Sequence, residues 1–129
     1  MWHEPMRLSA VLMVLGMYCL GGQLATAATP SQVAASALKQ CYFVAAYAYG
    51  ANKCDPPPMI FPSVRGRCSS EEDWLLDALS QEAKVRPGDP NETARIAMNY
   101  VLSKLEPQVQ SWILDAQIKA GGCAKPGGN

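Results

Sequence analysis

Histidine is almost missing from this chain: His3 is the one histidine, and the segment from Ala28 to Asn129 has none. That segment therefore lacks the Ser-His and Cys-His pairs that activate most catalytic nucleophiles, and the commonest zinc ligand. No Cys-x-x-Cys pair is present, which leaves zinc ribbons and thioredoxin-like redox centres unsupported. No glycine-rich loop leads into a predicted helix, as a phosphate-binding loop would. We therefore predict that the protein is not an enzyme and has no cofactor and no metal site.

An excess of charge of either sign is also missing. The chain has 11 lysines and arginines and 11 aspartates and glutamates, and the two signs are interspersed. Binding to nucleic acid or to an anionic membrane surface normally requires a basic patch. The charge pattern therefore argues against a nucleic-acid partner.

The longest apolar run covers residues 8–20, which is 13 residues and too short to span a bilayer, where about 20 are needed. Gly21-Gly22-Gln23 ends this run, and Ala25-Thr26-Ala27 supplies the small residues of a signal-peptidase site. We predict that residues 1–27 are a cleaved signal peptide and that the mature protein is periplasmic or extracellular. No stable membrane insertion is expected after cleavage.

Alternatives remain open at this end of the chain. Met6-Arg7 followed by Leu8 is a more ordinary signal start than Met1, so translation from Met6 is an alternative. Lipidation at Cys19 is disfavoured because the bulky Tyr18 precedes it. An uncleaved membrane anchor is a further minority alternative.

Four cysteines follow the predicted signal: Cys41, Cys54, Cys68 and Cys123. An even number in a short exported chain predicts two disulfides, with three possible pairings. Cys54 and Cys68 flank a proline-rich stretch where two antiparallel helices would meet, so we favour Cys54–Cys68, which leaves Cys41–Cys123. A helical segment between Cys41 and Cys54 would hold these two cysteines too far apart to bond.

Periodicity predicts an all-α fold. Apolar residues at three-to-four spacing predict a helix that Ser31 caps and that runs to about Gly50. Residues 53–67 are expected to form a loop, because Pro56-Pro57-Pro58 and Pro62 oppose regular structure. Ser69, with Glu72 three residues later, fits a capping box that starts the next helix, which ends at Pro87-Gly88-Asp89.

A third helix is expected from Pro90, capped by Asp89. We predict that it breaks at Glu106-Pro107, because an unbroken helix over residues 90–120 would be about 46 Å long. The expected fold is a small bundle of three to four helices stapled by two disulfides. It forms one domain over residues 28–124, and residues 125–129 are expected to be a disordered tail.

An aromatic group on the first predicted helix is the candidate partner-binding site: Tyr42, Phe43, Tyr47 and Tyr49. These residues spread around the helix instead of following one stripe, so some rings face solvent or a partner unless the helix is central. Core packing is the competing interpretation.

Two sets of charged residues after residue 27 could have functional roles, but structural roles explain them better. Asp73 and Asp77 share a helix face and could form an acid/base pair, but a solvated helix face explains them better. Arg65 and Arg67 could bind an anion, but pairing with Glu71 and Glu72 across the loop is favoured.

The leading hypothesis is a small exported, non-enzymatic protein that binds another exported protein. In general type the chain resembles small bacterial exported proteins, including periplasmic immunity proteins and enzyme inhibitors, which implies an inhibitor- or immunity-like role. The first alternative is a carrier of a small apolar ligand, with a cavity lined by six side chains (Tyr42, Phe43, Tyr47, Met59, Phe61 and Trp112). An enzyme that uses carboxylates or a thiol is less favoured.

Overall fold

The computed structural model describes residues 27–121, and these contain four α-helices and no strand. The helices are α2 (Pro30–Asn52), α3 (Pro57–Arg67), α4 (Ser69–Ala83) and α5 (Pro90–Ala120). The prediction of an all-α fold with three to four helices is confirmed for this part of the chain.

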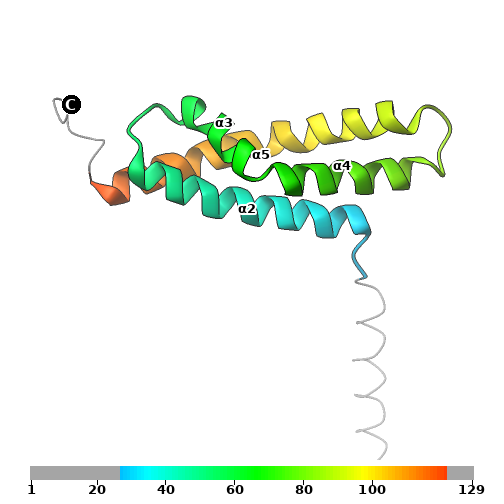
Figure 1. Ribbon diagram of the computed structural model, residues 1–129, viewed down its shortest axis with the longest axis horizontal. Coiled ribbons are helices and arrows are strands. Elements are labelled where there is room, and N and C mark those ends of the chain that lie inside the picture. Colours follow the sequence, from blue (N-terminus) through cyan, green and yellow to red (C-terminus); the bar gives the residue numbers. More distant parts are fainter. Residues whose placement is uncertain (1–26, 122–129) are drawn as a thin grey trace, which may run out of the picture.

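The four helices form three rods (Figure 1). α2 and α5 run in the same direction, and α3 followed by α4 runs back against both of them. Only Cys68 separates the end of α3 from the start of α4, so these two helices make one bent arm. Its bend carries Cys68 to the middle of α2, and this contact positions the candidate site described below.

α2 begins at Pro30, with Thr29 as its N-cap. The Thr29 hydroxyl accepts a hydrogen bond from the backbone N–H of Gln32, and the Gln32 side chain accepts one from the N–H of Thr29. The predicted N-cap, Ser31, is therefore wrong, because Ser31 is already helical and the cap is Thr29, two residues earlier. The Ser31 N–H instead donates to the carboxylate of Glu82 on α4, at 3.0 Å.

The predicted loop over residues 53–67 is wrong, because residues 57–67 form α3. Pro57 is the first helical residue, where proline is tolerated because that N–H would have no partner. Pro62 lies inside the helix and removes one backbone hydrogen bond, the one to the Pro58 carbonyl. Burial of Ile60, Phe61 and Val64 against the core offsets this loss.

The predicted N-cap of α4 is wrong, whereas the predicted N-cap of α5 is right. Ser69 does not cap α4, because it is already helical and Cys68 occupies the N-cap position without a side-chain cap. Glu72 turns instead to Tyr42 and Arg65. α4 ends at Ala83, before the predicted stop at Pro87. The Asp89 cap of α5 is confirmed, since its carboxylate accepts from the Asn91 N–H at 3.0 Å.

α5 is unbroken from Pro90 to Ala120, so the predicted break at Pro107 is wrong. Pro107 lies on the exposed side of the helix, where the carbonyl that it leaves without a partner can bind water. The helix is about 46 Å long and is accommodated because the bundle is elongated (Figure 1).

The predicted disulfide pairing is also wrong. Cys41 is bonded to Cys68, with Cα atoms 5.9 Å apart. This bond excludes both Cys54–Cys68 and Cys41–Cys123. The reason is α3: its 11 helical residues place Cys54 and Cys68 at opposite ends of a rod about 16 Å long, well beyond disulfide distance.

Buried side chains from all four helices form the core. α2 contributes Leu38, Tyr42 and Ala45, and the Tyr42 ring meets the Phe61 ring of α3 in a T-shaped contact with the centroids 6.0 Å apart. α5 contributes Val109 and Ile113, among others.

Several predictions concern residues that the structure does not describe. The predicted signal peptide (1–27) falls almost entirely outside residues 27–121, and so do Cys123 and the tail at 125–129. Among the described helices, none is long and apolar enough to cross a membrane.

Candidate functional site

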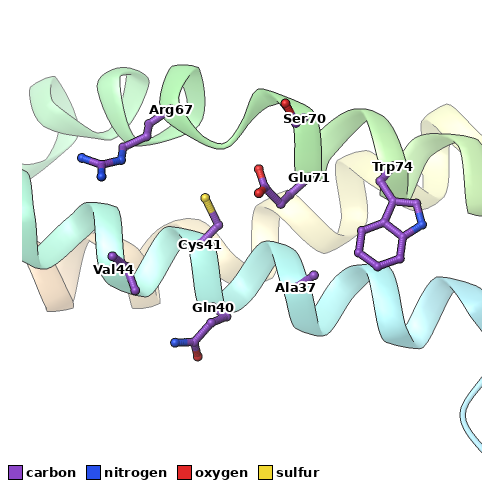
Figure 2. A pocket seen from close by; sticks show the side chains of 8 residues that line it. All are labelled: Ala37, Gln40, Cys41, Val44, Arg67, Ser70, Glu71 and Trp74. Carbon is purple, nitrogen blue, oxygen red and sulfur yellow. The ribbon is translucent and has the colours of Figure 1, made fainter.

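A groove with a volume of about 550 Å³ lies between α2 and the bend of the α3–α4 arm (Figure 2). Eight residues line it: Ala37, Gln40, Cys41, Val44, Arg67, Ser70, Glu71 and Trp74. We call it the disulfide groove, because the Cys41–Cys68 bond closes it where the arm bends. It is mostly apolar and has polar groups at its rim.

The disulfide holds the two walls of the groove together. Cys68 is completely buried and Cys41 is half-buried. The Glu71 side chain comes from the first turn of α4 and points toward the Cys41 sulfur (Figure 2). A carboxylate oxygen of Glu71 and the two sulfurs all lie within 4.8 Å of one another.

Large apolar side chains remain exposed at the two ends of this groove. Trp74 on α4 is 47% exposed, and its ring lies beside Ala37 (Figure 2). At the other end, Val44 on α2 is 50% exposed and lies near Arg67. Tryptophan and arginine are common anchors of protein–protein interfaces. The disulfide groove thus has the composition of a binding surface.

A polar network that runs from buried Tyr42 to exposed Arg65 lies next to the groove. The Tyr42 hydroxyl donates to a carboxylate oxygen of Glu72, and Arg65 pairs with the same carboxylate through two hydrogen bonds of 2.9 and 3.1 Å. Burial and the nearby Glu72 charge raise the pKa of Tyr42 above its ordinary value. The expected pairing of Arg65 across this region is confirmed for Glu72. The network fixes the arm against α2 and so positions the groove.

A second hollow of about 260 Å³ lies along the adjacent side of α2. Its walls include Phe43 and Trp112, whose ring centroids are 5.1 Å apart. Phe43 also lies 4.8 Å from the Tyr47 ring. Gln40 lines both this hollow and the disulfide groove, so one outward stretch of α2 borders both.

Tyr47 links α2 to α5 beside this aromatic cluster. Its hydroxyl donates to Asp115 at 2.5 Å, and Lys119 pairs with the same carboxylate at 2.8 Å. The hydrogen bonds from Lys119 and Tyr47 hold the pKa of Asp115 below its ordinary value of 3.8.

We expect these contacts to make stability depend on pH. Folding lowers the pKa of Asp115, so the ionised carboxylate stabilises the folded state. This stabilisation is fully present above pH 3.8 and is lost as the pH falls through the pKa of Asp115 in the folded protein. Asp115→Asn is therefore expected to lower Tm at pH ~7 and to have little further effect near pH ~2. Thermal unfolding followed by circular dichroism at both pH values measures this difference. The exposed Asp77→Asn serves as the control, and an equal loss at both pH values would contradict the assignment.

The four aromatic residues of the predicted binding site do not form one surface. Tyr42 is completely buried in the core. Phe43 is 41% exposed and Tyr47 lies beside it, on the side of α2 that faces Trp112. Tyr49 is half-buried, with the Lys53 ammonium 5.4 Å from its ring centre.

The residues of the proposed apolar-ligand cavity are divided between separate places. Tyr42 and Phe61 pack together in the core, whereas Phe43, Tyr47 and Trp112 cluster between α2 and α5. Met59 is 67% exposed. Asp73 and Asp77, the candidate acid/base pair, are both exposed on α4.

Sequence reasoning missed two residues of interest. Trp74 was not among the candidate residues, and nothing in the sequence indicated that it borders a groove. Gln117, which is buried on α5, donates to the carbonyls of Lys53 and Asp55 at 3.1 and 2.7 Å. It joins the end of α2 to the end of α5, and a lone glutamine in an apolar stripe was the available signal.

Comparison of the chain with protein-family models, with curated proteins and with solved structures finds no match.

Proposed function

We propose that this protein is an exported, non-enzymatic interaction protein that binds another exported protein through the disulfide groove. An inhibitor- or immunity-like role, in which the partner is itself blocked by binding, fits a domain of this size. The residues that carry the contact are Trp74, Val44 and Arg67, with Phe43 extending the surface along α2.

The observation that carries this proposal is the exposure of Trp74 beside the groove. Partly exposed apolar side chains border the groove on both of its walls, and the polar side chains of Gln40 and Ser70 also line it. Interfaces commonly combine buried aromatic anchors with a polar rim. The groove adds a concave region to this surface, into which a side chain of the partner would insert.

The proposed export is supported by the signal-like sequence of residues 1–27 and by the Cys41–Cys68 bond. Structural disulfides persist in oxidising compartments such as the periplasm and the extracellular space. The proposed lack of enzymatic activity rests on the absence of histidine after residue 27.

A second disulfide, between Cys54 and Cys123, belongs to the same proposal. Cys54 is disulfide-bonded, and the other two cysteines of the described segment are bonded to each other. The hydrogen bonds of Gln117 bring the last turns of α5 to the residues on either side of Cys54. Cys123 lies two residues beyond Gly121, which ends α5. Non-reducing peptide mapping tests this pairing.

Site-specific photo-crosslinking in the exporting cell tests the interaction. A photoreactive residue at Val44 is expected to yield a discrete adduct with an exported protein, whereas one at Lys104, on the exposed side of α5, is not. Mass spectrometry of the adduct identifies the partner. Absence of an adduct at Val44, or equal adducts at both positions, would overturn the proposal.

Once the partner is identified, Trp74→Ala is expected to reduce its binding about tenfold or more, as truncation of an aromatic anchor commonly does. Leu76→Ala is the matched control, because Leu76 is also exposed on α4 but lies outside the groove lining. Titration of the purified partner, followed by calorimetry, measures both affinities. Similar losses for the two variants would place the interface elsewhere.

A further inference from the structure

We propose that reduction of the Cys41–Cys68 disulfide creates a zinc-binding site, formed by the two cysteine thiolates and the Glu71 carboxylate. A fourth coordination position would face the disulfide groove. The site borders the groove assigned to the protein partner, but zinc binding and its test do not require that partner.

The three donor groups already stand at nearly suitable separations. The two sulfurs and a Glu71 oxygen lie within 4.8 Å of one another. Around a tetrahedral zinc ion, with Zn–S of about 2.3 Å and Zn–O of about 2.1 Å, neighbouring ligand atoms are roughly 3.7 Å apart. The Cα atoms of Cys41 and Cys68 are 5.9 Å apart, so side-chain rotation alone can open the sulfurs to that spacing. Only small shifts are needed.

The position of Glu71 is the second observation. Its carboxylate points toward the Cys41 sulfur from the first turn of α4 (Figure 2), and the Cys68 sulfur lies within 4.8 Å of it. No ion pair within residues 27–121 engages it, whereas the adjacent Glu72 is held by Arg65 and Tyr42. A carboxylate close to two sulfurs and held by no cation is therefore free to coordinate a metal.

The charges of the three ligand groups also favour binding of a zinc ion. Two thiolates and one carboxylate around Zn²⁺ leave a net charge of −1, and Arg67 lines the same groove. Cys68 is completely buried, so its thiolate would be costly without a nearby positive charge, which the metal supplies.

The redox step is an ordinary thiol–disulfide exchange. A dithiol reductant transfers two electrons and two protons to the Cys41–Cys68 bond and becomes a disulfide itself, leaving two thiols on the protein. Binding of Zn²⁺ then releases the two thiol protons, while Glu71 binds as the carboxylate. Three protein ligands with one open position is the arrangement of zinc sites that accept a further ligand. In this protein that ligand would enter through the groove.

Zinc titration of the reduced protein, in competition with a chromophoric chelator, tests the site. The reduced wild type is expected to bind one Zn²⁺ at this site, in a manner that depends on Glu71. The oxidised protein is expected to bind none there. Glu71→Gln is expected to weaken binding by about tenfold or more. Asp73→Asn removes a neighbouring exposed carboxylate and is expected to bind as the wild type does. The Cys41→Ser/Cys68→Ser variant, which retains the other cysteines, is expected to lose this binding.

Cobalt provides a second readout, because a thiolate–cobalt charge-transfer band appears only when sulfur is bound. Helical content is recorded in parallel, and if reduction unfolds the protein the titration is repeated with trimethylamine N-oxide, which favours the folded state. Zinc binding that is equal in the wild type, Glu71→Gln and the double serine variant would overturn the proposal. So would a folded, reduced wild type that takes up no zinc.

Discussion

Replacing both cysteines of the disulfide groove, as Cys41→Ala/Cys68→Ala, is expected to lower the free energy of unfolding by roughly 3.5 kcal/mol. The bond joins residues 27 apart in sequence, and in the chain-entropy model a closed loop of this length restricts the unfolded chain by about that amount. A loss of this size is a large part of the stability of a small domain. Urea unfolding of the oxidised wild type and the variant, both followed by circular dichroism, measures the difference.

Reduction supplies the control for this prediction. With dithiothreitol and a metal chelator present, the wild type and the Cys41→Ala/Cys68→Ala variant are expected to unfold at similar urea concentrations, because neither then has the cross-link. The chelator is required because zinc bound to the reduced cysteines would stabilise the wild type by mass action. An oxidised wild type no more stable than the variant would show that the bond is strained or that the arm is held by other contacts.

The same bond shows where sequence reasoning failed. The pairing of Cys54 with Cys68 followed from the expectation that residues 53–67 form a loop, and the prolines were the reason for that expectation. Proline opposes a helix only where its missing N–H or its ring conflicts with the preceding turn. Pro57 stands at the first helical position, where neither conflict occurs, and the loss at Pro62 is outweighed by burial of Ile60 and Val64.

Pro107 illustrates the same physical point in α5. The break was predicted from the proline and from the length of an unbroken helix. Both arguments depend on surroundings that a sequence pattern does not contain, namely which side of the helix is exposed and how long the bundle is. Predictions that depend on local sequence were confirmed. An example is the Asp89 N-cap, whose hydrogen bond joins residues two apart in sequence.

The candidate site could be predicted only in part. The sequence predicted that some of the four aromatic rings on α2 face outward, without saying which, and Phe43 is 41% exposed. Tyr42 was included in the same group but is buried, because α2 contacts α3, α4 and α5 and so has little free surface on that side. The groove depends on the bend at Cys68 and on the neighbourhood of Trp74 and Ala37, which lie far apart in sequence. Such long-range contacts leave no periodic signal.

Gly50→Ala is expected to destabilise the protein by about 3 kcal/mol, the upper part of the usual range for adding a methyl group to a packed core. Gly50 lies where α2 crosses α5. A Cβ atom at this position would lie 2.7 Å from the Ile113 carbonyl oxygen and 2.8 Å from the Ala116 Cβ. The first of these is a backbone atom, so the contact can be relieved only by moving the two helices apart. Urea unfolding again measures the loss.

Gly66→Ala makes the same chemical change in a different environment, and the opposite sign is expected. Gly66 lies in the last turn of α3, and nothing lies within 4 Å of the position that its Cβ would occupy. Alanine there is expected to stabilise the protein by up to about 1 kcal/mol, because it restricts the unfolded chain and favours the helix. The two substitutions therefore separate helix propensity from helix contact. If Gly50→Ala also stabilised the protein, the close crossing of α2 and α5 would be wrong, and the packing of Ile113 against α2 would need to be reconsidered.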